Sequence, residues 1–169
     1  MIFGVTKSLM TALDIELAVV RYFNPRPNII IPNISWGFDI HEYGLLICTK
    51  AGYLYEVEIK TSYNDLVKDK LKWHKHNSDK IKELYFALPK SLTKHYNLVP
   101  ERAGILEIDI AENYYHNQDK YVCKKIKNAV INKTSKLTLE EKFKLTRLGT
   151  MRIFKLKEQI NDLRNIIRG

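Results

Sequence analysis

The first amphipathic pattern in the chain spans residues 8–22, where apolar residues recur at helical spacing at Leu9, Leu13, Leu17 and Val20. This spacing predicts a helix. Pro25 and Pro27 follow closely, and two prolines so near each other cannot continue a helix, so we expect it to end before them. The apolar run 28–32 that comes next predicts a short strand.

Two β-rich runs, 43–49 and 53–60, are separated by the three residues Lys50-Ala51-Gly52. A three-residue hairpin loop favours a left-handed residue at its last position, which glycine adopts easily. The alternative is a two-residue turn made of Ala51 and Gly52, which would shift the pairing by one residue. We prefer the longer loop because alanine is poorly suited to positive φ.

The three-residue loop fixes which residues of the hairpin face one another. It places Gly44 opposite Glu58 and Glu42 opposite Lys60. The expected alignment therefore brings a second carboxylate, Glu42, to the strand face that carries Glu58.

Further elements follow the hairpin. Ser62 or Asn64 would cap a helix that runs to about residue 76, with Leu66 and Trp73 packed inward. The remaining pattern predicts a strand at 84–88, a helical turn at 91–95 and a strand at 103–110. This order predicts an α/β fold in which a mixed central β-sheet is flanked by helices.

The C-terminal third differs in pattern. We expect a strand at 121–127, a basic linker at 128–136, a capping box of Thr138 with Glu141, a helix to residue 148, a break at Gly149 and a second helix at 151–167. We therefore divide the chain into a core of residues 1–110 and a basic strand and helical extension, residues 111–169, packed on or next to that core.

The last predicted helix has an apolar stripe. Ile153, Leu156, Ile160 and Leu163 fall at positions i, i+3, i+7 and i+10. We favour packing or self-association for this stripe, which makes a homodimer through the C-terminal helix a candidate assembly. The opposite, basic face of the extension is a candidate DNA-contacting surface.

Charge is unevenly distributed along the chain. The net charge is +9, but residues 1–110 hold 14 Lys+Arg against 13 Asp+Glu, whereas residues 111–169 hold 14 against 6. A basic segment attracts polyanions through counterion release, although a solvated basic surface without a partner has the same composition. We expect DNA as the partner.

Other features exclude several protein classes. No apolar run is long enough to span a bilayer, and the N-terminus lacks the pattern of a signal peptide, so we expect no membrane association. Two cysteines, Cys48 and Cys123, are too few for a disulfide framework or a four-ligand zinc site. These features predict a cytoplasmic protein.

The strand 53–60 carries the candidate chemistry. Val57 and Ile59 face one side, whereas Glu56, Glu58 and Lys60 share the other. Two carboxylates one strand apart can hold Mg²⁺, which polarises a phosphate and activates a bound water. A lysine two residues after a carboxylate points the same way and can orient that water or stabilise transition-state charge. The backbone carbonyl of Ile59 is a further candidate ligand.

An ordered series of motifs is similar to a known family. It runs Trp36-Gly37, His41-Glu42-Tyr43-Gly44, Lys50-Ala51-Gly52-Tyr53, Glu56-Val57-Glu58-Ile59-Lys60, Asp65, Asp69, Lys72, His74-Lys75-His76, Leu84–Pro89 and Val99–Leu106. The series resembles the PD-(D/E)XK nuclease superfamily, most closely its MmcB-like DNA-repair proteins and related phage and bacterial proteins. The resemblance covers roughly residues 10–110.

The resemblance implies a restriction-endonuclease-like fold and an Mg²⁺- or Mn²⁺-dependent DNA nuclease of DNA repair or phage-type DNA processing. In it, Glu58 matches the metal-binding carboxylate, Lys60 the catalytic lysine, and Glu16 an acidic residue that some members place near the metal. Gly44 departs from the family, which usually has the principal metal-binding aspartate at that position.

Three interpretations of this departure stay open. In the first, the site is active and Glu42 supplies the missing ligand, with help from Asp39 or Glu16. In the second, the fold is kept without catalysis and the protein binds DNA or another partner. In the third, Glu42 and Lys60 form a cross-strand ion pair on a structural sheet.

Two basic segments are candidate nucleic-acid contacts. The first comprises Lys68, Lys72, Trp73, His74 and His76; the second comprises Lys124, Lys125 and Lys127. His74 and His76 are two residues apart, so on a helix they point in different directions and make a poor metal-binding pair. For the first segment, the alternative is a solvated helix end.

Overall fold

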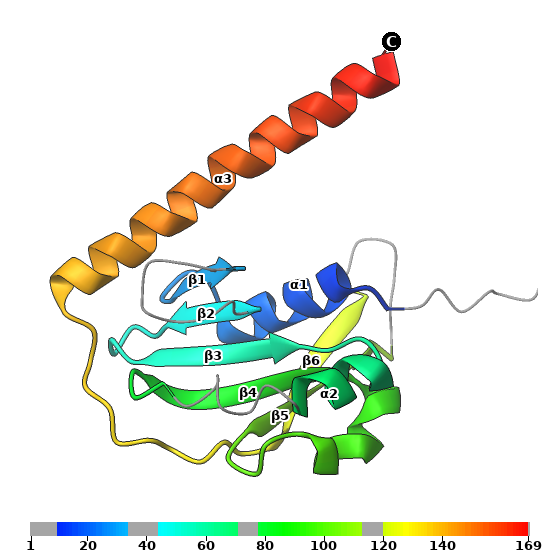
Figure 1. Cartoon of the computed structure of the whole chain (residues 1–169), viewed down its shortest axis with the longest axis vertical. Coiled ribbons are helices and arrows are strands. Elements are labelled where there is room, and N and C mark those ends of the chain that lie inside the picture. Colours follow the sequence, from blue (N-terminus) through cyan, green and yellow to red (C-terminus); the bar gives the residue numbers. More distant parts are fainter. Residues whose placement is uncertain (1–9, 34–43, 71–77, 113–119, 169) are drawn as a thin grey trace, which may run out of the picture.

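The computed structural model describes residues 10–33, 44–70, 78–112 and 120–168. In chain order its elements are α1 (Ala12–Phe23), β1 (Ile29–Pro32), β2 (Leu45–Cys48), β3 (Leu54–Ile59), α2 (Tyr63–Lys70), β4 (Ile81–Pro89), the 3₁₀-helix η2 (Lys90–Leu98), β5 (Gly104–Ile110), β6 (Tyr121–Lys127) and α3 (Leu139–Arg168). The strands form one mixed sheet with helices on both faces (Figure 1). The predicted α/β class is confirmed.

The sheet keeps its strands in sequence order, from β1 at one edge to β6 at the other. Strands β1, β2 and β3 are antiparallel neighbours, β3, β4 and β5 are parallel, and β6 returns antiparallel to β5. Parallel neighbours need crossover connections, which α2 and η2 supply. As a result β3 lies inside the sheet, and its polar residues lie among packed elements.

The hairpin between β2 and β3 has the predicted three-residue loop. Leu45 pairs with Val57 and Cys48 with Leu54. Gly52 has a φ of +91°, and its N–H donates to the carbonyl of Thr49 at 2.7 Å. The preferred register is therefore confirmed, and the position before Leu45 falls opposite the position after Val57.

Helix α1 covers one face of the sheet, but not with the residues that its sequence pattern indicated. Ile15, Ala18 and Val19 are buried against the sheet, whereas Leu13 and Leu17 are 60% and 45% exposed. The leucines lie on the opposite side of the helix. Small and β-branched side chains on the inner side allow close packing against the strands. The prediction that the face with Leu13 and Leu17 is the buried one was therefore wrong.

The start of α1 is also later than the predicted residue 8. Thr11 is the N-cap, and its side chain and that of Asp14 form a reciprocal capping box. Met10 is not helical, and Leu9 lies outside the described residues. The capping box of Thr11 and Asp14 therefore fixes the start of α1 at Ala12.

The other face of the sheet carries two separate apolar clusters. One joins Leu46 and Leu54 to Leu145 of α3, and the other joins Leu84 and Phe86 to the α2 residue Leu66. The inward packing predicted for Leu66 is confirmed. The part of β3 that carries Glu56 and Glu58 falls between these two clusters.

The linker 128–136 contains no helix or strand, as predicted, and leads the chain back across the sheet. The N–H of Asn132 donates to the carbonyl of Lys82 at 2.9 Å, and that of Leu137 donates to the carbonyl of Gly52 at 2.8 Å. These hydrogen bonds place the start of α3 beside the β2–β3 hairpin. The linker therefore joins the C-terminal segment to the same core.

Helix α3 is continuous from Leu139 to Arg168, so the predicted break at Gly149 was wrong. A Cβ atom at Gly149 would lie 3.0 Å from Cδ1 of Ile31, which indicates that glycine serves close packing against β1 there. The predicted capping box of Thr138 and Glu141 is confirmed.

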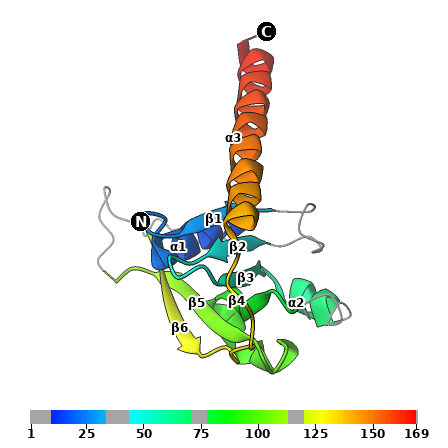
Figure 2. The same cartoon turned by 90° about the vertical axis from the view of Figure 1, so that its left-hand side faces the viewer.

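Figure 2 shows the rest of α3 extending away from the body of the protein. No helix within the described ranges combines the length and the apolar character that crossing a bilayer requires.

Candidate functional site

Strand β3 carries acidic side chains into the interior of the protein. Glu56 is fully buried and Glu58 is 8% exposed, although alternation in an ordinary strand would leave this face to solvent. Val57 is buried in the cluster on the opposite face, where Ile59 packs beside it. The predicted division of the strand into an apolar and a polar face is confirmed, and the polar face is itself covered.

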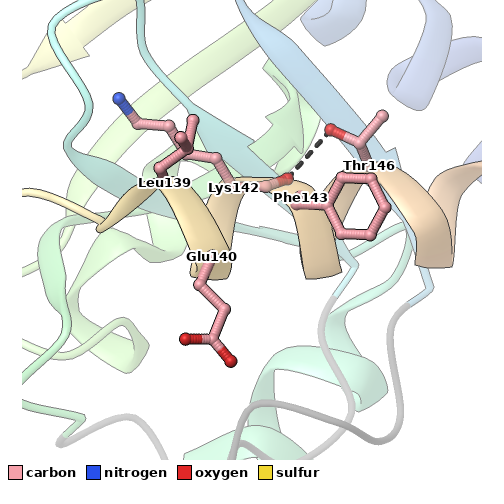
Figure 3. A pocket seen from close by; sticks show the side chains of 5 residues that line it. All are labelled: Leu139, Glu140, Lys142, Phe143 and Thr146. Carbon is pink, nitrogen blue, oxygen red and sulfur yellow. Dashed lines mark hydrogen bonds between the residues drawn. The ribbon is translucent and has the colours of Figure 1, made fainter.

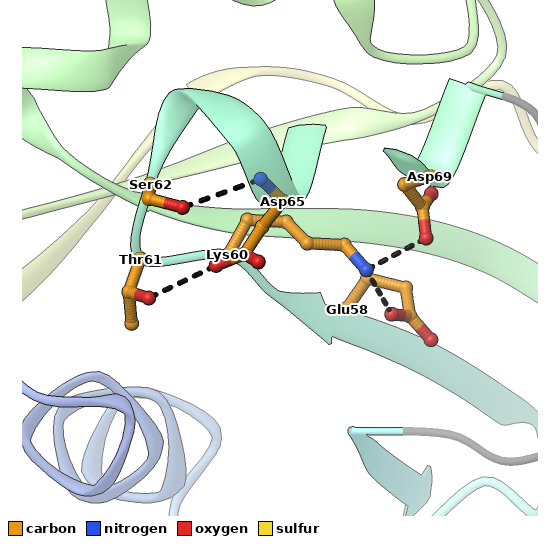
Figure 4. Close-up of polar contacts among 6 residues, drawn as sticks. All are labelled: Glu58, Lys60, Thr61, Ser62, Asp65 and Asp69. Carbon is orange, nitrogen blue, oxygen red and sulfur yellow. Dashed lines mark hydrogen bonds and ion pairs between the residues drawn. The ribbon is translucent and has the colours of Figure 1, made fainter. Parts of the chain in front are cut away.

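The ammonium group of Lys60 is the centre of the site (Figure 4). Its Nζ donates to Oε2 of Glu58 at 2.9 Å and to Oδ1 of Asp69 at 2.6 Å. The three side chains are only 13%, 10% and 5% exposed. Nζ also lies 5.9 Å from the ring centroid of Phe86. A cation is thus held between two carboxylates in a largely desolvated place.

Two opposing effects set the pKa of Lys60. Burial lowers it, and the neighbouring carboxylates of Glu58 and Asp69 raise it by more, so the pKa lies above the ordinary lysine value. The side chain is therefore an ammonium ion at neutral pH. It has three N–H donors, and the two carboxylates accept two of the hydrogen bonds.

The turn after β3 positions α2 so that Asp69 reaches Lys60. Of the two expected caps, Ser62 and Asn64, Ser62 caps the helix, since its Oγ accepts from the N–H of Asp65 at 3.2 Å. Thr61 Oγ1 donates to Asp65 at 3.1 Å. Hydrogen bonds from Ser62 and then Thr61 lower the pKa of Asp65. Asp69 comes one turn after Asp65 and lies over the end of β3 (Figure 4).

Asp69 was not among the site residues predicted from the sequence. The available signal was that Asp69 lies three residues after Leu66, which places both on one face of the helix. An acidic residue on the buried face of a helix that follows Glu-x-Lys would have identified it.

Gly44 stands where the resemblance implies an aspartate. Its carbonyl accepts from the N–H of Asn33 at 2.9 Å. A Cβ atom at Gly44 would lie 2.8 Å from the backbone oxygen of Val57 and 3.2 Å from the backbone nitrogen of Ile59. Any side chain at this position would therefore require the backbone of β2 or β3 to shift.

Several predicted site residues lie outside the described part of the chain: Asp39, Glu42, Lys72, Trp73, His74 and His76. Their roles stay predictions, as does the metal-binding role of the Ile59 carbonyl. The ion pair proposed between Glu42 and Lys60 likewise falls outside the described residues, whereas the described partners of Lys60 are Glu58 and Asp69.

Glu16 lies on α1, which covers the face of the sheet opposite Glu58. Burial raises the pKa of Glu16, and the nearby Arg152 of α3 partly offsets this effect. The described interactions of Glu16 thus connect it with α3 and do not bring it to Glu58.

The oxygen donors of the site permit a test of metal binding. Within the described residues, no group of three or more His, Cys, Asp or Glu side chains is arranged to hold a metal ion. Glu58 Oε2 and Asp69 Oδ1 are at most 5.5 Å apart, because both contact Lys60 Nζ at 2.9 and 2.6 Å, so a metal ion bound beside the ammonium would have to use the other oxygen of each carboxylate. Two carboxylates with water molecules are a donor set that fits Mg²⁺.

The predicted basic residues that are described do not converge. Lys68 is exposed on α2. Lys124 and Lys125 lie on edge strand β6, where they pair with Glu107 and Leu106. Successive residues of a strand point to opposite faces, so these two lysines do not form one surface. Lys127 donates to the carbonyl of Glu101 at 2.7 Å.

A different basic cluster surrounds Tyr53, at the other end of β3. Lys82 Nζ lies 3.3 Å and Lys136 Nζ 5.5 Å from the centre of the Tyr53 ring. Lys142 Nζ would be 3.1 Å from a Cβ atom on the adjacent Gly52. No carboxylate in the described ranges forms an ion pair with these three lysines. The sequence did not reveal this cluster because its members come from four separate segments.

Comparison with known proteins shows the fold alone. A protein of unknown function from Silicibacter pomeroyi, SPO1766, is similar in structure, with a TM-score of 0.63 and 14% sequence identity. The similarity covers 93% of this chain and 95% of that chain. No protein-family model and no curated protein matches the sequence.

Proposed function

We propose that the chain is a metal-dependent nuclease that hydrolyses DNA phosphodiester bonds, with Glu58 and Lys60 as its catalytic pair. The observation that carries this proposal is the ammonium of Lys60, held at 2.9 Å from Glu58 and 2.6 Å from Asp69 at the end of an interior strand. Placing three charged groups in such a desolvated position is costly for folding, which favours a functional role.

The roles follow from the donors and acceptors present. Glu58 and Asp69 offer the oxygen atoms that Mg²⁺ or Mn²⁺ prefers. When bound, such an ion polarises a phosphate and acidifies a coordinated water. Lys60 uses two N–H groups on the carboxylates, which leaves the third for a phosphate oxygen or the attacking water. Its positive charge would stabilise the negative charge that develops in the transition state.

The basic cluster of Lys82, Lys136 and Lys142 around Tyr53 supports DNA as the substrate. Lysines without carboxylate partners attract phosphates, and an aromatic ring beside them can stack with a base. Tyr53 lies five residues before Glu58, which at strand rise is about 16 Å. The cluster is therefore a candidate phosphate-binding surface separate from Lys60.

The test is incubation of the purified protein with linear, nicked and branched DNA in Mg²⁺ or Mn²⁺. We expect cleavage that Lys60→Ala reduces by about 10²–10³-fold, the loss typical when a charge-stabilising donor is removed. Lys94→Ala, a change at an exposed lysine on η2, is the matched control and should leave cleavage intact. Cleavage that persists in Lys60→Ala would come from a contaminant or another site and would refute the assignment.

A second candidate is a DNA-binding protein of the same fold without catalysis. The Gly44 geometry favours it, because a side chain there would contact the backbone of β3 at 2.8 Å and the expected ligand position is closed. Absence of cleavage on every substrate, together with DNA binding that weakens steeply as salt is added, would support this candidate over the nuclease.

A further inference from the structure

We propose that the distal half of α3, residues 153–167, is a dimerisation helix that pairs with the same helix of a second copy of this chain. Every residue from 153 to 167 is exposed, and the helix leaves the body of the protein there (Figures 1 and 2). The inference is independent of the proposed nuclease activity.

The exposed segment carries an apolar seam with heptad spacing. Its members alternate at intervals of three and four residues and are 55%, 40%, 48%, 59% and 83% exposed, in the order Ile153, Leu156, Ile160, Leu163 and Ile167. Isoleucine thus occupies each a position of the heptad and leucine each d position. This arrangement favours parallel two-stranded coiled coils.

The seam begins where contact with the body ends. Counted back in the same heptads, the earlier core positions hold Gly149, Thr146, Lys142 and Leu139. Gly149 packs against Ile31. Lys142, Thr146 and Leu139 line a shallow hollow at the start of α3, where Thr146 Oγ1 donates to the carbonyl of Lys142 at 2.9 Å (Figure 3). Because Gly149, Thr146 and Lys142 are small or polar, the continuous apolar seam begins only after Gly149.

A second copy fits this surface because the seam is self-complementary. In a parallel pair, each Ile or Leu meets its own counterpart across the two-fold axis. Ten such side chains would bury roughly 600–1,200 Å², given about 60–120 Å² for each. That area reaches only the lower limit for specific association, so we infer a weak and reversible dimer.

The residues that flank the seam predict how the dimer responds to salt. Lys157 and Arg164 follow the leucine positions, and Arg152 and Gln159 precede the isoleucine positions. In a parallel pair Arg152 would face Lys157 of the second copy and Gln159 would face Arg164, so one flanking contact at each edge joins two basic groups and neither joins opposite charges. Added salt screens this repulsion and should strengthen the dimer. Binding of an acidic partner helix or of DNA to the same surface would weaken with salt instead.

Analytical ultracentrifugation of the full chain over a hundredfold concentration range, at low and high salt, tests the proposal. We expect a reversible monomer–dimer equilibrium that tightens as salt rises. The double variant Ile160→Gln/Leu163→Gln should weaken association by about tenfold or more, since both changes put a polar amide into the seam. The matched control is Asn161→Gln/Asn165→Gln, which adds the same residue outside the seam and should dimerise as the unmodified chain does.

All four positions are exposed, so the variants should fold alike, which circular dichroism and thermal unfolding will check. A chain that remains monomeric at every concentration and salt level would overturn the proposal. Equal association of the two double variants, or a dimer that weakens as salt rises, would overturn it as well.

Discussion

The substitution Lys60→Met tests whether the polar site beneath α2 is held together by its central ammonium. Methionine keeps most of the length and apolar stem of lysine and removes the charge. In the native protein that charge lies 2.9 Å from Glu58 and 2.6 Å from Asp69. Without it, two carboxylates face each other in a place with little access to water.

The expected cost follows from the geometry. The two contacts to one nitrogen limit the separation of the carboxylate oxygens to 5.5 Å. At an effective dielectric constant of about 20, two like charges at that distance repel by about 3 kcal/mol. Lys60→Met should therefore lower the free energy of unfolding by about 3 kcal/mol, within the range for breaking a buried ion pair.

Urea denaturation at neutral pH, followed by circular dichroism, measures the change. Lys68→Met is the control, because Lys68 is exposed on the same α2 helix, and it should stay within about 0.5 kcal/mol of the unmodified chain. Glu58→Gln added to Lys60→Met removes one of the facing charges and should restore about 1–3 kcal/mol. A double variant no more stable than Lys60→Met alone would refute the proposed repulsion.

Three further predictions concern other parts of the fold. Gly44→Ala should lower the free energy of unfolding by about 1–3 kcal/mol in urea denaturation, because its Cβ would meet the Val57 backbone oxygen at 2.8 Å; a neutral effect would contradict this contact. In the same assay, Leu145→Ala should cost about 2–5 kcal/mol and Phe143→Ala less than about 0.5 kcal/mol, since the first side chain is fully buried and the second 70% exposed; similar costs would argue against the packing of α3. Burial, then the neighbouring Glu83, raises the pKa of Tyr55 to about 12. Its contribution to stability should thus be complete below pH 10 and disappear as pH rises through 12. Burial also raises the pKa of Tyr22 and Tyr85, so ultraviolet absorbance of the folded protein should show several late-ionising tyrosines, and Tyr55→Phe should remove only the step near pH 12.

The sequence was sufficient where short segments determine their own structure. Gly52 at the end of a three-residue loop indicated the β2–β3 register, and Thr138 with Glu141 indicated the start of α3. Ser62 likewise indicated the start of α2. In each case the turn or cap is formed by residues within four positions of one another, so the interaction that fixes the structure is contained in the local pattern.

Contacts between distant segments were not contained in any local pattern. Leu13 and Leu17 have the spacing of a buried helix face, yet Ile15, Ala18 and Val19 are the residues buried against the sheet. Which face is buried depends on the shape of the strands below the helix. Gly149 suggested a break, but it allows α3 to pass close to β1 without interrupting the helix.

The candidate site combines both kinds of information. Strand alternation alone placed Glu58 and Lys60 on one face, because side chains in a strand repeat every two residues. Asp69 contacts Lys60 only because α2 packs over the end of β3. A side chain at Gly44 is excluded only because the backbones of two strands lie close together there. The sequence thus determined which charged groups β3 carries, and the tertiary structure decided which partners surround them, because those partners come from elements that meet only in the folded chain.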